Sequence, residues 1–426
     1  MRHYLTSTVF AFSLLASPLV IAQDCVTQVS DMSLFTKSKA SGLFREAIDK
    51  GPVTVDIANI KNYNDYIRST KQIIESRNPR ATLPCPLMTP TAKLLNLTNP
   101  KVSDLIAPFS LEHDNKDHAI LLIHGLTDSP FTFHYLAAAL YEAGYNVRTM
   151  LLPGHATAPS DLTEVDIDDW QTHTDYAIAQ TSQDFKHFSV LGYSTGAAIV
   201  LSSIAKHKPN NLGSVALISP ATEPHNKNGW LAKWIDYVPF VNWIDEDADL
   251  DFAKYESFPW HGATLAHQAM APLKSLTTLP DVPMFISYSD VDTTIDNHAT
   301  AKLLEKWQPK SKLTRFIYSE TPPAKAKQGV NYRSVKADNI VDMSHIGILQ
   351  PPEHVFYGRK GPYRNCTSYH LEDQAFINCR TGKTVHFGER HEKSMTQYAA
   401  LARITFNPDY SNFEQTLLAF FDGHND

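Results

Sequence analysis

Apolar runs of strand length alternate with amphipathic stretches of helical length from His118 onward. The runs predict strands at residues 119–123, 146–151, 188–192, 215–218, 284–288 and 313–318. The amphipathic stretches predict helices at residues 131–143, 167–183, 195–206 and 298–307, and a final helix at 413–421 that packs on the sheet. This alternation is typical of the α/β class, with a mostly parallel central sheet flanked by helices on both faces.

Two intervals interrupt the alternation. The fourth and fifth predicted strands are separated by 65 residues, too many for an ordinary crossover connection. We expect an inserted helical cap at about residues 221–278 and a second insertion at about 351–393. Residues 23–110 precede the alternating pattern as an N-terminal extension, so that the main domain spans residues 111–426.

The composition limits the class of protein and of partner. Hydrophobic residues make up 43% and charged residues 19%, which is usual for a globular protein and excludes a largely disordered chain. The net charge is -7 and no basic block occurs, so we expect no nucleic-acid partner. Neither HExxH nor HxxEH occurs, and we expect no metal and no cofactor.

The first 22 residues have the layout of a signal peptide. Arg2 supplies a positive end, a mostly apolar run covers residues 9–21, and Ala22 precedes the polar Gln23. The run contains Pro18 and is shorter than the roughly 20 residues that span a bilayer, which favours cleavage over an uncleaved membrane anchor. We therefore expect a secreted or periplasmic protein.

Four cysteines in an exported chain can pair in three ways. Twelve residues separate Cys366 from Cys379, so we expect this pair to close a local loop or hairpin. Cys25 and Cys85 then remain to fasten the N-terminal extension. An oxidising compartment favours both bonds, whereas a cytosolic protein would carry four free thiols.

Residues 192–196 read GYSTG, a G-x-S-x-G pattern. The pattern follows a predicted strand and opens a predicted helix, the context in which a sharp turn holds a serine hydroxyl above the sheet. Glycine is favoured on both sides because a side chain there would collide with the neighbouring strand or helix. This context predicts that Ser194 is a nucleophile rather than a structural turn residue.

A serine that attacks a carbonyl group creates an oxyanion, which needs fixed hydrogen-bond donors. One donor is expected to be the backbone N–H of Thr195, the residue after the nucleophile. The other should follow an earlier strand, where residues 121–130 read LLIHGLTDSP. We expect the chain to turn at Gly125 and to direct the Leu126 N–H at the oxyanion; the simpler interpretation is a turn that only needs Gly125.

Three motifs together resemble the α/β-hydrolase family, in particular its carboxylesterase and monoacylglycerol-lipase-like branch. They are HGLTDSP (residues 124–130), LLPGHATAP (residues 151–159) followed by Asp169-Trp170, and GYSTG. The resemblance covers roughly residues 118–350 and the last helix. It implies a parallel sheet, a cap between the sixth and seventh strands of the family's sheet, and a triad in the order serine, acid, histidine.

That order locates the remaining members of the triad. The stretch DMSHIG at residues 342–347 resembles the family's Ser-His loop, which implies His345 as the general base. The family's acid pattern, G-x-x-D-x-x-V, fits residues 289–295 with serine and isoleucine in the outer positions, and so implies Asp292. Asp290 and Asp296 are the alternatives. His124 and His155 are expected to hold loops by hydrogen bonds.

The cap suggests the substrate. It is rich in aromatic residues (Trp230, Trp234, Tyr237, Phe240, Trp243, Phe252, Phe258 and Trp260), most of which we expect to pack within the cap. An aromatic pocket wall favours esters with short to medium acyl chains or lipid-derived monoesters, as small molecules or at a lipid surface.

Two alternative functions use the same fold. One is a serine peptidase or amidase, for which acidic cap residues would bind a substrate ammonium group; a solvated acidic face is the simpler interpretation of these residues (Asp245, Glu246, Asp247, Asp249 and Asp251). The other is a non-catalytic binding protein on a hydrolase scaffold.

Overall fold

The computed structural model describes residues 23–228, 231–236, 238, 242–276, 281–307, 312–325, 329–366 and 373–423. The predicted signal peptide, residues 1–22, lies outside the described residues. Among the helices in these ranges, none combines the length and the apolar character needed to cross a bilayer.

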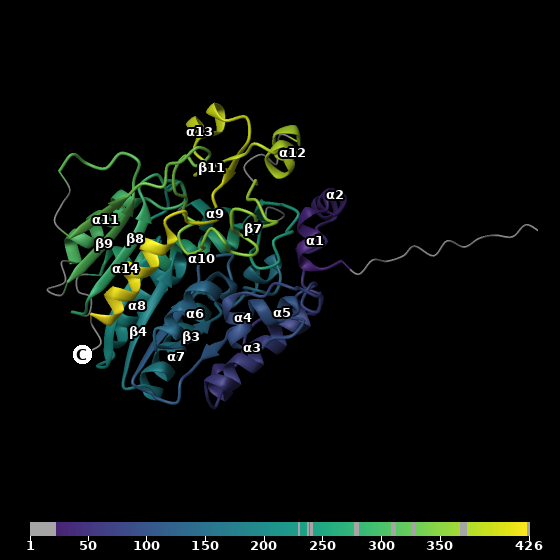
Figure 1. The fold of residues 1–426 in the computed structure, drawn as a ribbon. Coiled ribbons are helices and arrows are strands. Elements are labelled where there is room, and N and C mark those ends of the chain that lie inside the picture. Colours follow the sequence, from purple (N-terminus) through teal and green to yellow (C-terminus); the bar gives the residue numbers. More distant parts are fainter. Residues whose placement is uncertain are drawn as a thin grey trace, which may run out of the picture.

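The described residues form a central eight-stranded sheet in the order β1-β3-β2-β4-β5-β8-β9-β10 (Figure 1). Only the short edge strand β1 runs antiparallel to its neighbour, β3, so the predicted mostly parallel sheet is confirmed. The strands are β1 (Ser110–Leu111), β2 (His118–Ile123), β3 (Asn146–Met150), β4 (His187–Tyr193), β5 (Leu212–Ile218), β8 (Met284–Ser289), β9 (Leu313–Tyr318) and β10 (Val330–Arg333).

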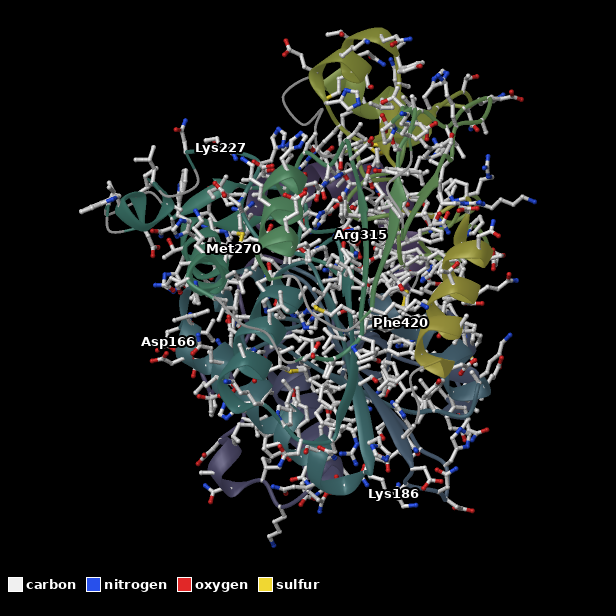
Figure 2. All side chains as sticks on the ribbon, turned by 90° about the vertical axis from the view of Figure 1, so that its left-hand side faces the viewer. Asp166, Lys186, Lys227, Met270, Arg315 and Phe420 are labelled. Carbon is white, nitrogen blue, oxygen red and sulfur yellow. A yellow bond between two sulfur atoms is a disulfide. The ribbon has the colours of Figure 1, made fainter. Side chains whose placement is uncertain are left out.

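Helices cover both faces of this sheet. Successive strand residues point to opposite faces. Ile120 and Leu191 lie in one core with α6 (His134–Glu142) and α14 (Tyr410–Asp422). Leu121 and Val190 lie in a second core with α7 (Ile167–Asp184), α8 (Thr195–His207), α10 (Trp260–Met270) and α11 (Asn297–Trp307). Figure 2 shows α10 near Met270 and α14 near Phe420 on opposite sides of the strands.

The predicted final helix is α14, and its phenylalanines pack on the sheet as expected. The ring of Phe285 on β8 lies 6.2 Å from Phe413 and 5.7 Å from Phe420, measured between centroids. The predicted helix at residues 131–143 begins instead with a 3₁₀ turn, η2 (Pro130–Phe133), before α6. A proline suits the first position of such a turn, because the N–H that proline lacks would have no partner within the turn.

The segment between β5 and β8 contains two different parts. The first includes α9 (Ala232–Ile235) and a short antiparallel pair, β6 (Trp243–Asp245) and β7 (Phe258–Pro259). The second is α10, followed by η5 (Ala271–Lys274). Leu265 and Ala269 bury α10 in the core beside α7 and α8, so this part of the predicted cap covers the sheet.

The prediction of a solvated acidic face is wrong for three of the five cap residues. Asp247, Asp249 and Asp251 are 1–2% exposed. Asp249 accepts hydrogen bonds from the backbone N–H groups of Glu256 and Ser257 at 2.9 and 2.7 Å. Such carboxylates tie the cap loop together, because backbone donors satisfy acceptors that would otherwise lie buried and unpaired.

The N-terminal extension contacts both the cap and the sheet. Its helices are α1 (Cys25–Ser30), α2 (Met32–Ser41), η1 (Ile57–Asn59), α3 (Tyr63–Arg77), α4 (Pro90–Leu94) and α5 (Val102–Ile106). The hydroxyls of Tyr63 and Tyr66 donate to the carbonyls of Thr149 and Leu151 at the end of β3. Ser38 Oγ donates to the carbonyl of Ala248 in the cap. The extension therefore braces the edge of the sheet and the cap loop together.

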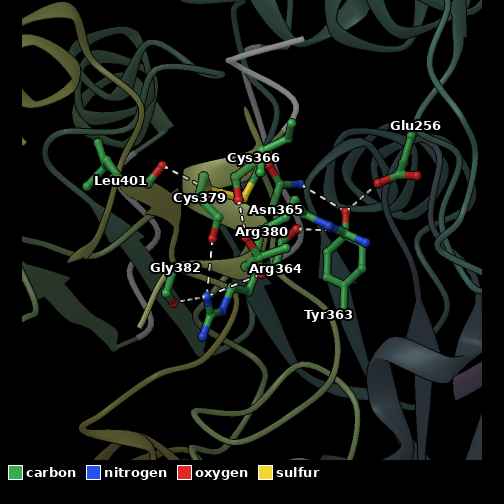
Figure 3. The surroundings of a disulfide bond; sticks show 11 residues. Glu256, Tyr363, Arg364, Asn365, Cys366, Cys379, Arg380, Gly382 and Leu401 are labelled. Carbon is green, nitrogen blue, oxygen red and sulfur yellow. Dashed lines mark hydrogen bonds between the residues drawn. A yellow bond between two sulfur atoms is a disulfide. The ribbon is translucent and has the colours of Figure 1, made fainter. Parts of the chain in front are cut away.

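Both predicted disulfide pairs are present. Cys25–Cys85 fastens α1 to the stretch before α4. Cys366–Cys379 joins a loop to α12 (Asp373–Thr381) in the second insertion (Figure 3). Tyr363, just before this bond, donates to Glu256 Oε1 at 2.8 Å and so connects the second insertion to the cap. The same region contains β11 (His386–Gly388), α13 (Glu392–Gln397) and β12 (Leu401–Arg403).

Replacing Asp251 by asparagine is expected to stabilise the protein more at pH 8 than at pH 5. Burial, followed by the charge of Glu256, raises the pKa of Asp251 to about 7. Folding therefore favours the protonated acid, and stability is lost as the pH rises from about 4, its unfolded value, to about 7. Asparagine removes this cost, which is on the order of 4 kcal/mol at pH 8.

Thermal melting at the two pH values measures the effect. The exposed Asp114→Asn variant is the matched control and should change neither midpoint. An equal change in melting temperature at pH 5 and pH 8 for Asp251→Asn would contradict the assignment.

Candidate active site

Ser194 lies at the sharp turn between β4 and α8. Its backbone is in a strained conformation for a residue with a side chain, with φ 52° and ψ -118°. A Cβ atom on Gly192 would lie 2.5 Å from the Ala197 Cα, and one on Gly196 would lie 2.4 Å from the carbonyl oxygens of Ile123 and His124. Both glycines are therefore needed for the close approach of α8 to the sheet.

The structure brings Ser194, His345 and Asp292 into one chain of hydrogen bonds. Ser194 Oγ lies 2.9 Å from His345 Nε2, and His345 Nδ1 lies 2.6 Å from Asp292 Oδ2. Because a carboxylate only accepts, Nδ1 carries the proton and Nε2 is free to accept from the serine hydroxyl. All three residues are buried, Ser194 being 7% exposed. The arrangement can transfer a proton from the serine to the imidazole.

The Asp292 carboxylate is fixed by its own loop. Its second oxygen, Oδ1, accepts from the backbone N–H groups of Thr294 (2.7 Å) and Ile295 (3.0 Å). The two alternative acids are placed differently. Asp290 is exposed, while Asp296 pairs with Lys227 and accepts from the first turn of α11. No hydrogen bond joins either alternative to His345 among the described residues.

The two predicted oxyanion donors, the N–H groups of Thr195 and Leu126, belong to two segments that meet at Ser194. Thr195 is the first residue of α8, so its N–H has no partner within the helix. Gly125 follows β2 so closely that a Cβ there would lie 2.9 Å from the Ser194 Cβ. Leu126 is the next residue in the chain, and the role of its N–H as the second donor stays a prediction.

The two motif histidines hold neighbouring loops. His124 Nδ1 donates to the carbonyl of Gly125 at 2.8 Å, and its Nε2 accepts from the Leu152 N–H at 3.1 Å. His155 Nδ1 lies 3.1 Å from the carbonyl of Pro153. Burial lowers the pKa of His124 to about 4 and that of His155 to about 3, so both stay neutral. Neutral rings let His124 accept and donate at once.

Sequence reasoning missed the groups that hold the backbone of His345. Its carbonyl oxygen accepts from Ser219 Oγ (3.1 Å) and Tyr193 Oη (3.4 Å). Its N–H donates to Glu389 Oε2 (3.1 Å), a residue of the second insertion. Glu389 belongs to none of the sequence motifs, and only the tertiary structure shows that it contacts the site.

The cap reaches the predicted oxyanion loop through Tyr255. Its N–H donates to the carbonyl of Thr127 (2.8 Å), and its hydroxyl donates to the carbonyl of Gly154 (3.0 Å). Of the predicted aromatic residues, Phe252 packs in the core against Phe131, while Trp230, Tyr237 and Phe240 lie outside the described residues. In the ranges that the structure describes, no group of three or more His, Cys, Asp or Glu residues is arranged to hold a metal.

Comparisons with known proteins identify what this chain is similar to. The family model described as serine aminopeptidase, S33, matches residues 114–254. The thermostable monoacylglycerol lipase of Bacillus sp. (strain H-257) is 27% identical over 190 residues, which cover 43% of this chain and 74% of the lipase. The region that the family model matches includes β2, the turn at Ser194 and the first part of the cap.

Solved structures of lipases are also similar in part. The monoacylglycerol lipase of Paleococcus ferrophilus is 16% identical with a TM-score of 0.43, covering 58% of this chain and 93% of its own. A soluble variant of the monoglyceride lipase of Saccharomyces cerevisiae is 16% identical with a TM-score of 0.42, covering 54% and 82%.

Proposed function

Because the chain is a monoacylglycerol-lipase-like α/β-hydrolase and a serine ester hydrolase, we propose that Ser194, Asp292 and His345 are its catalytic triad. The observation that carries this proposal is the continuous chain of hydrogen bonds from Ser194 Oγ through the His345 ring to Asp292 Oδ2. A serine hydroxyl is a poor nucleophile by itself, and a positioned imidazole activates it by removing its proton.

Acylation follows from this geometry. Ser194 Oγ attacks the carbonyl carbon of the ester while its proton moves to His345 Nε2, and Asp292 stabilises the resulting imidazolium. The carbonyl oxygen becomes an oxyanion, which the N–H groups of Thr195 and Leu126 are proposed to bind. When the tetrahedral intermediate collapses, the C–O bond to the alcohol breaks and the alkoxide takes the proton from Nε2.

Deacylation repeats these steps with water. His345 Nε2 removes a proton from water, the hydroxide adds to the acyl carbon, and the Ser194 oxygen leaves with that proton. The released products are a carboxylic acid and an alcohol.

The proposed substrates are carboxylic esters with short to medium acyl chains or lipid-derived monoesters. The monoacylglycerol lipase relative and the aromatic residues of the cap support this class. Several of these aromatics are half-buried, Phe258 and Trp260 among them, and such rings offer an apolar surface to an acyl chain.

The similarity to the serine aminopeptidase family, S33, favours one second candidate, hydrolysis of an aminoacyl bond. An aminopeptidase needs a carboxylate directed at the substrate's ammonium group. The buried carboxylates of Asp249 and Asp251 instead accept hydrogen bonds from the cap backbone, and Glu246 pairs with Arg45. These contacts favour ester over amide substrates.

Export is part of the proposal. The two disulfides are compatible with an oxidising compartment, and residues 1–22 have the composition of a signal peptide. We place the enzyme in the periplasm or outside the cell; amino-terminal sequencing of the exported protein tests this by showing cleavage near Ala22.

A substrate panel tests the proposed activity. p-Nitrophenyl esters of increasing chain length should be hydrolysed, with kcat/KM highest for short to medium acyl groups, and aminoacyl p-nitroanilides should react far more slowly. A fluorophosphonate should label Ser194. A chain that is neither labelled nor active on any ester would be a binding protein, and faster cleavage of the anilides would favour the peptidase.

A further inference from the structure

The loop that carries His345 does not rest on the central sheet alone. β11 runs alongside the preceding residues, with the Val341 N–H donating to the carbonyl of Phe387 (2.8 Å). Ser344 Oγ donates to the carbonyl of Ile404 (2.5 Å), just beyond β12. The second insertion and the chain after it therefore enclose this loop, and they bring Glu389 to the backbone N–H of His345.

Glu389 and Arg403 form a buried ion pair at this point. The side chains are 0% and 6% exposed, and the closest distance, Arg403 Nε to Glu389 Oε1, is 2.7 Å. Arg403 Nη2 donates to Glu389 Oε2 at 2.9 Å, the same oxygen that accepts from the His345 N–H. A buried carboxylate needs such a partner, because removal from water costs several kcal/mol per ion.

The same guanidinium also reaches the loop of the acid. Arg403 Nη2 donates to Thr294 Oγ1 at 2.6 Å, and the Thr294 N–H donates to Asp292 Oδ1 at 2.7 Å. One buried cation thus connects the loop of His345, through Glu389, to the loop of Asp292, through Thr294. The hydrogen bond between His345 and Asp292 depends on the relative position of these two loops.

The strand that supplies Arg403 is fastened by the second disulfide region. The Arg403 N–H donates to the carbonyl of Asn365 (2.9 Å), the neighbour of Cys366. Cys379 Sγ lies 3.4 Å from the carbonyl oxygen of Leu401 on the same strand. Figure 3 shows Leu401 beside the disulfide. The backbone of Arg403 is therefore held in place, in addition to the ion pair and hydrogen bonds of its side chain.

The pair is ionised at neutral pH. Burial acts to raise the pKa of Glu389, but the charge and hydrogen bonds of Arg403 outweigh it and hold that pKa well below its usual range. Other charged or titratable groups also surround the pair, from β4, β6, the acid loop and the segments beside β11: Tyr193, Asp245, Asp292, Asp342, Arg390 and His391.

We propose that Glu389 and Arg403 are positioning residues that hold His345 and Asp292 in register for proton transfer. This inference rests on the proposed role of the triad. The pair touches neither substrate nor reacting atoms; it acts through the His345 N–H on one side and through Thr294 on the other.

Removing one charge at a time gives opposite electrostatic signatures. Glu389→Gln leaves the cation of Arg403 beside His345, which disfavours the imidazolium, so the midpoint of the acid limb of kcat/KM should fall by about one pH unit. In Arg403→Met, Glu389 loses one cation but still accepts from the backbone N–H groups of His345 and Arg390 and lies near the Arg390 charge. Its carboxylate, once ionised above its raised pKa, favours the imidazolium, so that midpoint should rise by up to a similar amount. The double variant should return toward the wild-type midpoint.

The loss of positioning has its own signature in turnover. Arg403→Met should lower kcat by about 10- to 100-fold with little change in KM, because misplaced groups slow chemistry more than binding. Arg403→Lys keeps the charge but loses the forked contacts. It should restore the wild-type midpoint while kcat stays reduced.

A second buried ion pair provides the matched control. Arg77 and Asp161 are both fully buried and joined by two hydrogen bonds, but they link α3 to η3 (Pro159–Thr163). Arg77→Met should destabilise the fold without moving the pH midpoint. If Arg403→Met does not fold, Glu389→Gln and Arg403→Lys carry the test: a lower midpoint in the first and an unchanged midpoint in the second.

NMR titration of the His345 ring separates this inference from the proposed function, because it needs no turnover. Opposite shifts in Glu389→Gln and Arg403→Met would support the inference even in a chain that hydrolyses no ester. Unchanged midpoints, or shifts in one direction, would overturn it even if wild-type esterase activity is high. Loss of kcat that only follows the loss of folded protein, as in Arg77→Met, would also overturn it.

Discussion

Replacing Ser194 by alanine is expected to lower kcat for p-nitrophenyl esters by about 10⁵- to 10⁶-fold, because no other group in the proposed mechanism can form the acyl-enzyme. The fold should be retained. Alanine adopts the φ of 52° with no more strain than serine, and the hydroxyl that it removes is bonded only to the His345 ring among the described residues.

Steady-state kinetics and fluorophosphonate labelling measure this loss side by side with the wild type. Circular dichroism and thermal melting provide the control for folding. Residual turnover above a few per cent, or labelling that persists in the variant, would place the nucleophile on another residue and remove the basis of the triad assignment.

Replacing Asp292 by asparagine is expected to lower kcat by about 10⁴-fold while the geometry of the site is kept. The carboxylate oxygen that accepts from His345 Nδ1 at 2.6 Å would be replaced by an amide group. If the amide nitrogen faces the ring, Nδ1 must accept and Nε2 then carries the proton. An imidazole in that tautomer cannot remove the proton from Ser194.

The neighbouring acids supply the controls for this experiment. Asp290→Asn and Asp296→Asn should retain nearly the wild-type kcat, because neither carboxylate is hydrogen-bonded to His345 in the described structure. A large loss in Asp290→Asn together with a small loss in Asp292→Asn would reassign the acid. Fluorophosphonate labelling rates under the same conditions report the reactivity of Ser194 without dependence on substrate binding.

Much of the fold was predictable because local patterns carry it. Each of the six predicted strands is present, and successive residues such as Leu121 and Leu122 face different cores. The edge strands β1 and β10 were missed. They have only two and four residues, most of them half-buried, so their sequences show little hydrophobic periodicity. The burial of Asp247, Asp249 and Asp251 was also missed, because their backbone partners become available only in the folded loop.

Some residues of the candidate site could be predicted from the sequence, and others could not. The glycines on both sides of Ser194 predict that backbone segments approach closely there. The structure shows this approach for Gly192 at Ala197 and for Gly196 at the end of β2. His345 and Asp292 were selected through a family resemblance from among 19 histidines and several nearby acids. The structure places the His345 ring beside Ser194 and the Asp292 carboxylate beside that ring. Glu389 and Arg403 had no such signal.

The sequence by itself determined the sheet, the turn that raises Ser194 and the residue types available for proton transfer, because these depend on short-range sterics and on periodic burial. Only the tertiary structure decided which distant loops meet. The contact between Glu389 and His345, 44 residues apart, exists because a buried carboxylate, a backbone N–H and the Arg403 guanidinium satisfy one another away from water. No local pattern encodes a requirement that arises only when three segments are buried together.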